Sequence, residues 1–362
     1  MSYRKRYRKF NRKYNNRKTS PTLVIIGIIL AISLFSVYKE MIKNQDAQEA
    51  TSNVYSIVVS NTTGKYIYYE KPGVPKERDD VYVMYNLLSD EDKQVYNLFL
   101  DLVEHRNGDK YQSSIVISDN KRKILGDDHL WCVYYAMFYD HPEYFFLMSS
   151  PDVMQCSYYN QDNYYIYLYS MKTETEKEKQ QISKFNSAAN EFMKDIDSSL
   201  PDEEKELAIH DKLISLVSYG YDLYETSNLE ETNHDLGYFA YGALVSDSSG
   251  KKNHAVCNGY ALAFEYLCQL ADIPCCVITG DAYGTLPNTD QDSTDHAWNV
   301  VKIDGRWYEV DTTWDDNEVD TYRFYNKTTA EMESLLHIRG TTYTGTSEDI
   351  AVFRNKQIPV AE

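Results

Sequence analysis

The sequence lacks the motifs that mark several large classes of protein. It contains no P-loop, no dinucleotide-binding fingerprint, no cysteines and histidines at zinc-ligand spacing and no internal repeat. Its six cysteines in 362 residues are too few for a disulfide framework, and the adjacent Cys275 and Cys276 are poorly placed to bond to each other. We therefore expect no cofactor and no metal ion.

Basic residues are scarce beyond the first twenty positions. Residues 1–20 hold nine of the 37 Lys and Arg residues and no acid. The rest of the chain therefore holds 28 basic and 55 acidic residues, a net charge of −27. A surface of this sign repels nucleic acid, and we expect no nucleic-acid partner.

The basic block is followed by an uncharged, mostly apolar run. We predict that residues 1–20 are a cytoplasmic tail and that residues 21–38 are a single transmembrane helix, at the short end of the length needed to span a bilayer. The positive-inside bias then places the rest of the chain outside the cell. A cleaved signal peptide is the alternative, although no small-x-small cleavage site follows the apolar run.

Composition and hydrophobic periodicity divide the remainder of the chain. The predicted parts are a polar linker, an extracellular α+β region, a second α+β domain and a C-terminal tail, at 39–78, 79–200, 201–345 and 346–362. In the first α+β region we predict strands at 114–118, 144–148 and 164–169 and a helix at 127–138. The acidic segment 288–295 lacks the glycine and the distal glutamate of a calcium loop.

A β-hairpin is predicted around Asp304-Gly305, a strong two-residue turn signal. Such a turn pairs Ile303 with Arg306, and if the second strand runs on to Trp314, it places Trp298 opposite Asp311 and His296 opposite Thr313. These side chains then share one face, and His296 and Asp311 are diagonal neighbours within reach of each other. A three-residue loop with a bulge would break this arrangement.

A buried helix is predicted from about Cys257 onward. Its apolar residues recur on nearly all sides, and the helix should end before Pro274. Cys257 falls at the first turn, where free backbone N–H groups and the helix dipole favour a thiolate, and Gly259 leaves room for close backbone approach. A strand should follow from Cys275 to Gly280.

Together these elements predict a nucleophile, a base and an orienting acid. His296 would take the proton of Cys257 and return it to a leaving amine, and Asp311 would hold the imidazole. The alternative for each residue is ordinary packing and hydrogen bonding, which we assign to the other cysteines and to His210 and His254.

Three motifs carry a family resemblance. Val256-Cys-Asn-Gly-Tyr-Ala261, His296-Ala-Trp-Asn299 and Asp311-Thr-Thr-Trp-Asp315 occur in the order found in the transglutaminase-like superfamily, and the chain resembles its bacterial members over roughly residues 200–340. The resemblance implies a papain-like α+β core with Cys257, His296 and Asp311 as its triad.

The same resemblance implies what the protein does. We expect a membrane-anchored extracellular enzyme, either a protease or amidase or a transglutaminase-type acyltransferase, that attacks amide bonds of a protein or peptide substrate such as cell-wall peptide. The motif residues Gly259, Tyr260, Trp298 and Trp314 should support the site. Animal members carry an oxyanion-stabilising tryptophan upstream of the cysteine, and since Trp131 is far away in this sequence, a tyrosine or backbone N–H should replace it. The alternative is an inactive surface module that binds peptide or cell-wall polymer.

Overall fold

A computed structural model describes most of the chain after residue 54. The described residues are 55–59, 66–69, 80–104, 106, 114–120, 126–149, 153–160, 164–221, 223, 236–246, 253–283, 294–317, 319–340 and 358–362. The expected tail and transmembrane helix lie outside them, as does nearly all of the acidic segment 288–295. Among the helices that are described, none has both the length and the apolar character needed to cross a membrane.

The N-terminal part of the fold is a five-stranded antiparallel sheet with helices packed against it. Its strand order is β2-β1-β3-β5-β4. The strands are β1 (Tyr55–Val59), β2 (Tyr66–Tyr69), β3 (Ser114–Asn120), β4 (Met154–Asn160) and β5 (Tyr164–Met171). The stretch 39–78, which the sequence predicted as a linker, thus contributes two strands to this sheet.

Helices of this region connect the sheet to the rest of the fold. They are α3 (Val83–Leu87), α4 (Asp90–Glu104), α5 (Gly126–Asp140), the 3-10 helix η1 (Pro142–Tyr144) and α6 (Phe146–Ser149). The predicted strand at 144–148 is wrong, because Pro142 starts a helical turn and Phe145, Phe146 and Leu147 are buried in succession rather than alternately. The strands at 114–118 and 164–169 and the helix at 127–138 are confirmed.

A second sheet, of four strands, forms the C-terminal part. Its order is β10-β9-β8-β11, all antiparallel. The strands are β8 (Cys275–Ala282), β9 (Thr294–Ile303), β10 (Arg306–Val310) and β11 (His337–Arg339). The helices of this part are α7 (Glu176–Met193), α8 (Asp202–Leu216), η2 (Leu236–Tyr238), α11 (Ala240–Leu244), α12 (Cys257–Leu270), α13 (Thr312–Asp315) and α14 (Thr329–Ser334), and the strands β6 (Val217–Tyr219) and β7 (Asn253–Ala255) form a parallel pair.

The central helix α12 is buried on nearly all sides, as its sequence predicts. It packs against β8 and β9 on one side and against α8 and α11 on others. The helix ends at Leu270, and Asp272 with a positive φ of 61° turns the chain before Pro274 leads into β8. Burial of this helix, rather than helix propensity alone, fixes the start of α12 in the core.

The turn between β9 and β10 has the predicted geometry. Asp304 and Gly305 have φ angles of 49° and 81°, which suits a two-residue hairpin turn whose twist matches the flanking strands. Arg306 pairs with Ile303 and Val310 with Asn299, so the predicted register is confirmed over β10.

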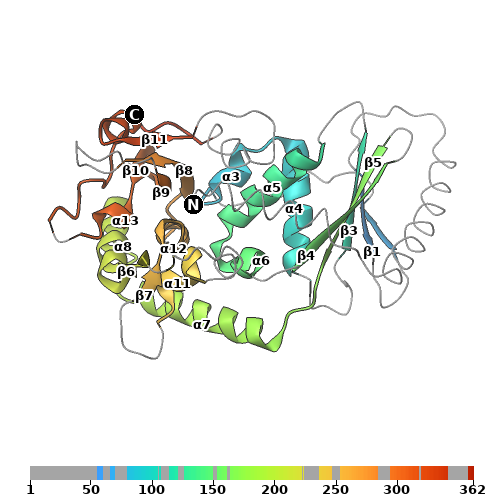
Figure 1. Ribbon diagram of the computed structural model, residues 1–362, viewed down its shortest axis with the longest axis horizontal. Helices are drawn as coiled ribbons and strands as arrows, with labels where there is room; N and C mark the ends of the chain where they lie inside the picture. Colours follow the sequence, from blue (N-terminus) through green and yellow to red (C-terminus); the bar gives the residue numbers. More distant parts are fainter. Residues whose placement is uncertain are drawn as a thin grey trace. The chain divides into compact units, whose positions relative to one another are not determined.

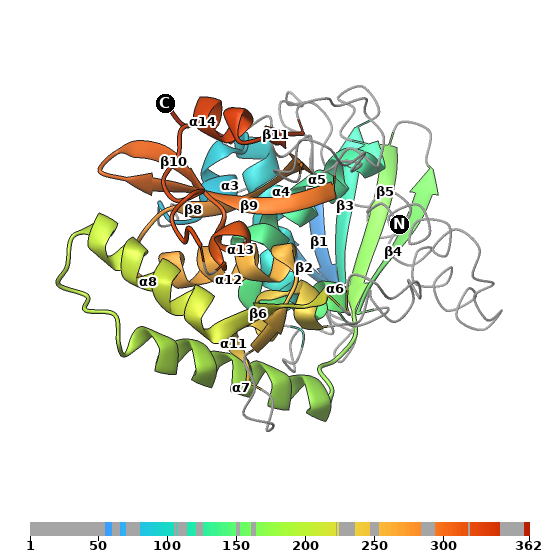
Figure 2. The ribbon, with the colours of Figure 1, turned by 60° about the vertical axis from the view of Figure 1, so that its left-hand side comes forward.

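The two sheets belong to one compact unit, residues 54–362. Helices α4 and α5 lie between them (Figures 1 and 2), with α4 against β3 and β5 and α5 against β8. Gln269 of α12 donates a hydrogen bond to the Asp140 carbonyl at 3.1 Å, and Tyr82 forms a parallel bridge with Cys275. The fold is α+β, and its N-terminal region packs against the core that carries Cys257.

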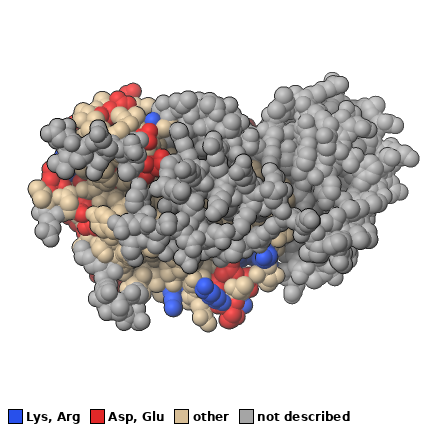
Figure 3. Space-filling model, viewed as in Figure 1, with Lys and Arg blue, Asp and Glu red and all other residues tan. Residues whose placement is uncertain are grey.

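Acidic side chains are prominent on the described part of the surface. On the face drawn in Figure 3 they lie at the end that carries the β8–β11 sheet and also at the lower edge, where most of the visible basic side chains lie. This distribution agrees with the net negative charge of the chain beyond its basic tail.

Candidate active site

Cys257 is the first residue of α12 and is half-buried. Val256 before it is extended, with φ −97° and ψ 176°, and its N–H donates to the Gly237 carbonyl at 3.0 Å. The first N–H groups of a helix have no partner within the helix and carry the positive end of its dipole. The predicted position of Cys257 at the start of a helix is therefore confirmed.

His296 joins Cys257 to Asp311. His296 lies on β9, is 7% exposed, and its Nε2 is 2.6 Å from Oδ2 of Asp311, which is 1% exposed. Burial alone would lower the pKa of His296, but the charge of Asp311, the hydrogen bond to it and the interaction with Cys257 raise that pKa to about 10. Since Nε2 is taken by Asp311, Nδ1 is the ring nitrogen left for the thiol. The three predicted residues are thus brought together in the predicted order.

Asp311 does more than contact His296. It is the N-cap of α13, and its Oδ1 accepts the N–H groups of Thr313 at 2.9 Å and Trp314 at 3.2 Å. The second strand of the hairpin consequently ends at Val310, and the expectation that it runs to Trp314 with Thr313 opposite His296 is wrong. The contact predicted between His296 and Asp311 nevertheless forms, because Asp311 directly follows the last paired residue of β10.

A second histidine, His337 of β11, shares the same carboxylate. Its Nε2 lies 2.9 Å from Oδ2 of Asp311, and the residue is 1% exposed. Sequence reasoning missed it, because His337 lies outside the three motifs and reaches the site only through the pairing of β11 with β8. No local pattern in the sequence could have predicted that contact.

Two tryptophans flank the histidine. The Trp298 ring stacks on His296 with centroids 5.9 Å apart, and the Trp314 ring lies at 5.7 Å. Trp298 is fully buried and donates its Nε1–H to Oε2 of Glu309 at 2.6 Å, while Arg339 and Thr329 bind the other oxygen of Glu309. The two expected supporting tryptophans therefore form part of the wall that shields the His–Asp pair from water.

Gly259 and Tyr260 lie on the first turns of α12. A Cβ atom at Gly259 would lie 2.5 Å from the Gly237 carbonyl oxygen and 2.9 Å from Cβ of Ala255, so the expected close backbone approach is confirmed. Tyr260 is buried, and its hydroxyl donates to Oδ2 of Asp316 at 2.6 Å. Burial and this bond raise the pKa of Tyr260, so it is a neutral donor.

Gly259→Ala is expected to destabilise the protein by about 1–3 kcal/mol, because the added methyl group meets backbone that cannot move aside freely. Chemical denaturation followed by circular dichroism measures the change. Leu270→Ala at the exposed end of the same helix is the matched control, with an expected effect within about 0.5 kcal/mol. Equal stabilities of the two variants would contradict the close contact.

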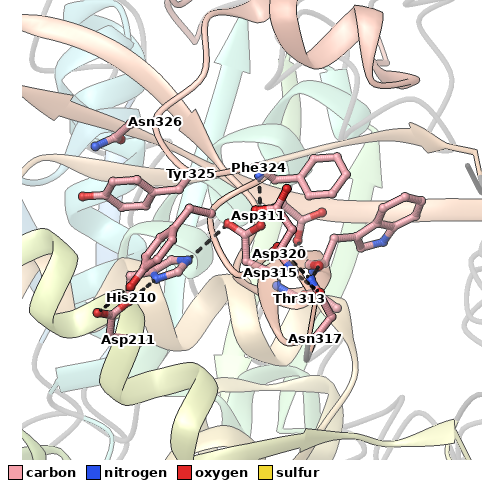
Figure 4. Close-up of polar contacts among 12 residues, drawn as sticks. His210, Asp211, Asp311, Thr313, Asp315, Asn317, Asp320, Phe324, Tyr325 and Asn326 are labelled. Carbon is pink, nitrogen blue, oxygen red and sulfur yellow. Dashed lines mark hydrogen bonds and ion pairs between the residues drawn. The ribbon is translucent and has the colours of Figure 1, made fainter.

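A buried network holds the segment that presents Asp311. His210 of α8 contacts Oδ2 of Asp315 through Nε2 at 3.2 Å, and Oδ1 of Asp315 accepts the Phe324 N–H at 2.9 Å (Figure 4). The Phe324 carbonyl in turn accepts the Asp311 N–H at 3.1 Å. His210 therefore has a specific structural partner. His254 lies on β7 and is exposed.

Other groups can be placed relative to the site. Trp131 on α5 packs against Tyr134, Tyr135 and Tyr169 and is not among the aromatic residues around His296. One side-chain nitrogen or oxygen atom from each of His296, Asp311 and His337 lies within 4.8 Å of the other two, a set that a metal ion could use. The two hydrogen bonds to Asp311 account for this convergence without an ion.

The segment that carries this site matches a known family model. Residues 187–312, which include all three residues, match the family model of the transglutaminase-like superfamily. Kyphoscoliosis peptidase of Homo sapiens is 44% identical over 68 residues, and that of Mus musculus is 43% identical over 68 residues. The chain spans only about a tenth of the length of these relatives, since each alignment covers 18% of this chain and 10% of the relative.

Parts of the chain also align with solved structures. A TGase crystal structure aligns with 44% of this chain and 45% of its own, at 12% identity and a TM-score of 0.28. A protein of Cytophaga hutchinsonii, described as a cysteine protease, aligns with 44% of this chain and 62% of its own, at 15% identity and a TM-score of 0.22. By the family match, the segment 187–312, which carries Cys257, His296 and Asp311, is a transglutaminase-like domain.

Proposed function

We propose that the protein is a cysteine-dependent acyl-transfer enzyme that acts on amide bonds through a thioester at Cys257. The observation that carries this proposal is the buried 2.6 Å contact between His296 and Asp311, together with the interaction of the same imidazole with the Cys257 side chain. A module that only binds a ligand has no use for a nucleophile, a base and an acid in this order.

The reaction follows from the roles of these atoms. The Cys257 sulfur attacks the amide carbonyl carbon while His296 holds the thiol proton. Collapse of the tetrahedral intermediate breaks the C–N bond, and His296 gives that proton to the leaving amine. Water or a second amine then attacks the thioester carbonyl and loses a proton to His296. The C–S bond breaks, the acid or the new amide is released, and the Cys257 thiolate takes up the proton from His296. Asp311 stabilises the imidazolium at each stage.

The oxyanion of the intermediate needs donors near the cysteine. We propose that the backbone N–H groups of Cys257 and Asn258 provide them, because they stand at the start of α12 and are preorganised by the helix, whereas those of Gly259 and Tyr260 already donate to the Val256 carbonyl at 2.8 and 3.1 Å. Trp131 cannot replace a tryptophan of the site, since it packs in the N-terminal region.

The location of the enzyme is a further part of the proposal. The basic residues 1–20 and the apolar run 21–38 support a single membrane anchor with the catalytic domain outside the cell. The substrates would then be proteins or peptides of the cell surface, including cell-wall peptides.

An activated thiol has a chemical signature that needs no known substrate. We expect Cys257 of the purified full-length chain to react rapidly with iodoacetamide at pH 6, where a free thiol with a pKa of about 8.5 is almost entirely protonated. Peptide mapping separates Cys257 from the other five cysteines, and rates measured from pH 5 to pH 10 give the profile.

His296→Ala is the variant that tests the cause. It should slow alkylation of Cys257 at pH 6 by a factor on the order of 100, because the thiolate loses its cationic partner, while leaving the rate at pH 10 nearly unchanged. Slow alkylation of the wild type at pH 6, with an ordinary rate at pH 10 that proves access, would contradict the catalytic assignment and favour an inactive binding module.

A further inference from the structure

His337 occupies an unusual position beside the proposed triad. It starts β11, pairs with Ala282 of β8, and points its Nε2 at the same oxygen of Asp311 that receives His296. The two histidines come from strands on either side of β8, which lies between β9 and β11 in the sheet. The carboxylate is thus held from two directions within one sheet.

The hydrogen bonds of Asp311 fix the orientation of its carboxylate. Oδ1 accepts two backbone N–H groups of α13, and Oδ2 accepts from both imidazoles. An ionised carboxylate can only accept hydrogen bonds, so Nε2 of each histidine must carry a proton. For a neutral His296, this leaves Nδ1 as the unprotonated nitrogen that faces the thiol.

The ring of His337 is itself fixed by packing. The rings of Trp314 and Phe324 lie with centroids 4.6 Å from it, and the Trp298 ring lies at 5.4 Å. Its Nδ1 lies 3.4 Å from the Leu335 carbonyl. The titratable groups that face it are Asp311 and His296, while the nearby Glu309 and Arg339 pair with each other. Because the His337 ring is held in place, its Nε2–H can fix the orientation of the Asp311 carboxylate that it contacts.

We propose that His337 is a positioning residue, which orients the Asp311 carboxylate and through it the imidazole of His296. The proposal rests on the proposed function of Cys257, His296 and Asp311. His337 touches neither the thiol nor a substrate in this scheme, and it acts by keeping Oδ2 in line with Nε2 of His296. Small misplacements of such a group have large effects on the rate of a proton transfer.

Two substitutions separate positioning from packing. His337→Gln keeps an N–H donor at a similar distance from the backbone, whereas His337→Leu keeps apolar bulk and removes the donor. We expect His337→Leu to lower the iodoacetamide rate of Cys257 at pH 6 by about 10-fold or more, and His337→Gln to restore it to within about threefold of wild type. At pH 10, where the thiol ionises without help, all three proteins should react at the same rate.

The outcomes distinguish this proposal from the one on which it rests. Slow wild-type alkylation at pH 6 overturns both. Rapid wild-type alkylation with an equally rapid His337→Leu variant, or with a His337→Gln variant as slow as His337→Leu, overturns the positioning role alone. A rate loss in His337→Leu that is as large at pH 10 as at pH 6 shows a general disruption of the site and also overturns it.

A measurement on the unaltered protein covers the case in which a variant does not fold. In the full-length chain labelled with 15N-histidine, the ring nitrogens of His337, assigned by elimination with single substitutions of the other histidines among the eight, report its protonation. A proton on Nε2 is the expected result. An unprotonated Nε2 would overturn the proposal, since it could not donate to Asp311.

Discussion

Replacing Cys257 by alanine is expected to abolish amide turnover while leaving the fold intact. Among the residues that the structure describes, the Cys257 thiol is the one that interacts with His296, and loss of the nucleophile in a triad costs a factor on the order of 10⁶ in kcat. The removed atom is small and the residue is half-buried at a helix start, so we expect the stability to change by less than about 1 kcal/mol.

The measurement combines two assays, because either water or an amine can accept the acyl group. The first assay uses glutamine peptides, in which ammonia release and fluorescent-amine incorporation report deamidation and transamidation. The second assay follows cleavage of a casein digest and reports proteolysis. Cys156→Ala is the matched control, since Cys156 lies on β4 in the other sheet and should leave both assays unchanged. Turnover that persists in Cys257→Ala would show that Cys257 is not the nucleophile.

The hairpin shows why part of this site could be predicted from the sequence. A two-residue turn at Asp304-Gly305 fixes the register of both flanking strands, and the period of two then determines which side chains meet. His296 and Asp311 are separated by only fifteen positions, so their contact is local. Cys257 was placed for a similar reason, since the helix that it begins has a clear periodicity and a proline beyond its end.

The parts that were missed depend on tertiary contacts or on competition between local signals. The sequence Thr312-Thr-Trp continues a strand-like pattern, but Asp311 caps the next helix and ends the strand. His337 meets Asp311 only because β11 pairs with the edge of β8 that faces away from β9, and no local sequence pattern around either residue predicts that pairing. His210 and Asp315 meet across 105 positions in the same way.

The carboxylate of Asp311 is the point on which the rest of the site depends, and Asp311→Asn tests it. The amide oxygen can still cap α13, but the amide nitrogen then faces two N–H donors, those of His296 and His337. Leaving buried donors unpaired costs about 1–3 kcal/mol, and the imidazole of His296 can escape this cost by adopting the other tautomer. In that tautomer Nδ1 carries the proton and cannot accept one from Cys257. We expect turnover to fall by a factor on the order of 10⁴.

The same substitution makes a prediction about stability that depends on pH. The folded-state pKa of His296, about 10, lies above its unfolded value of about 6.5, so the stability that this group contributes is complete below pH 6.5 and is lost as the pH rises through 10. Because Asp311→Asn removes the charge that raises this pKa, the difference in unfolding free energy between wild type and variant should be largest near pH 6 and should shrink towards pH 10. Urea denaturation at pH 6, 8 and 10 measures it. A difference that stays constant over this range would mean that Asp311 stabilises the fold through hydrogen bonds that do not depend on the charge of His296.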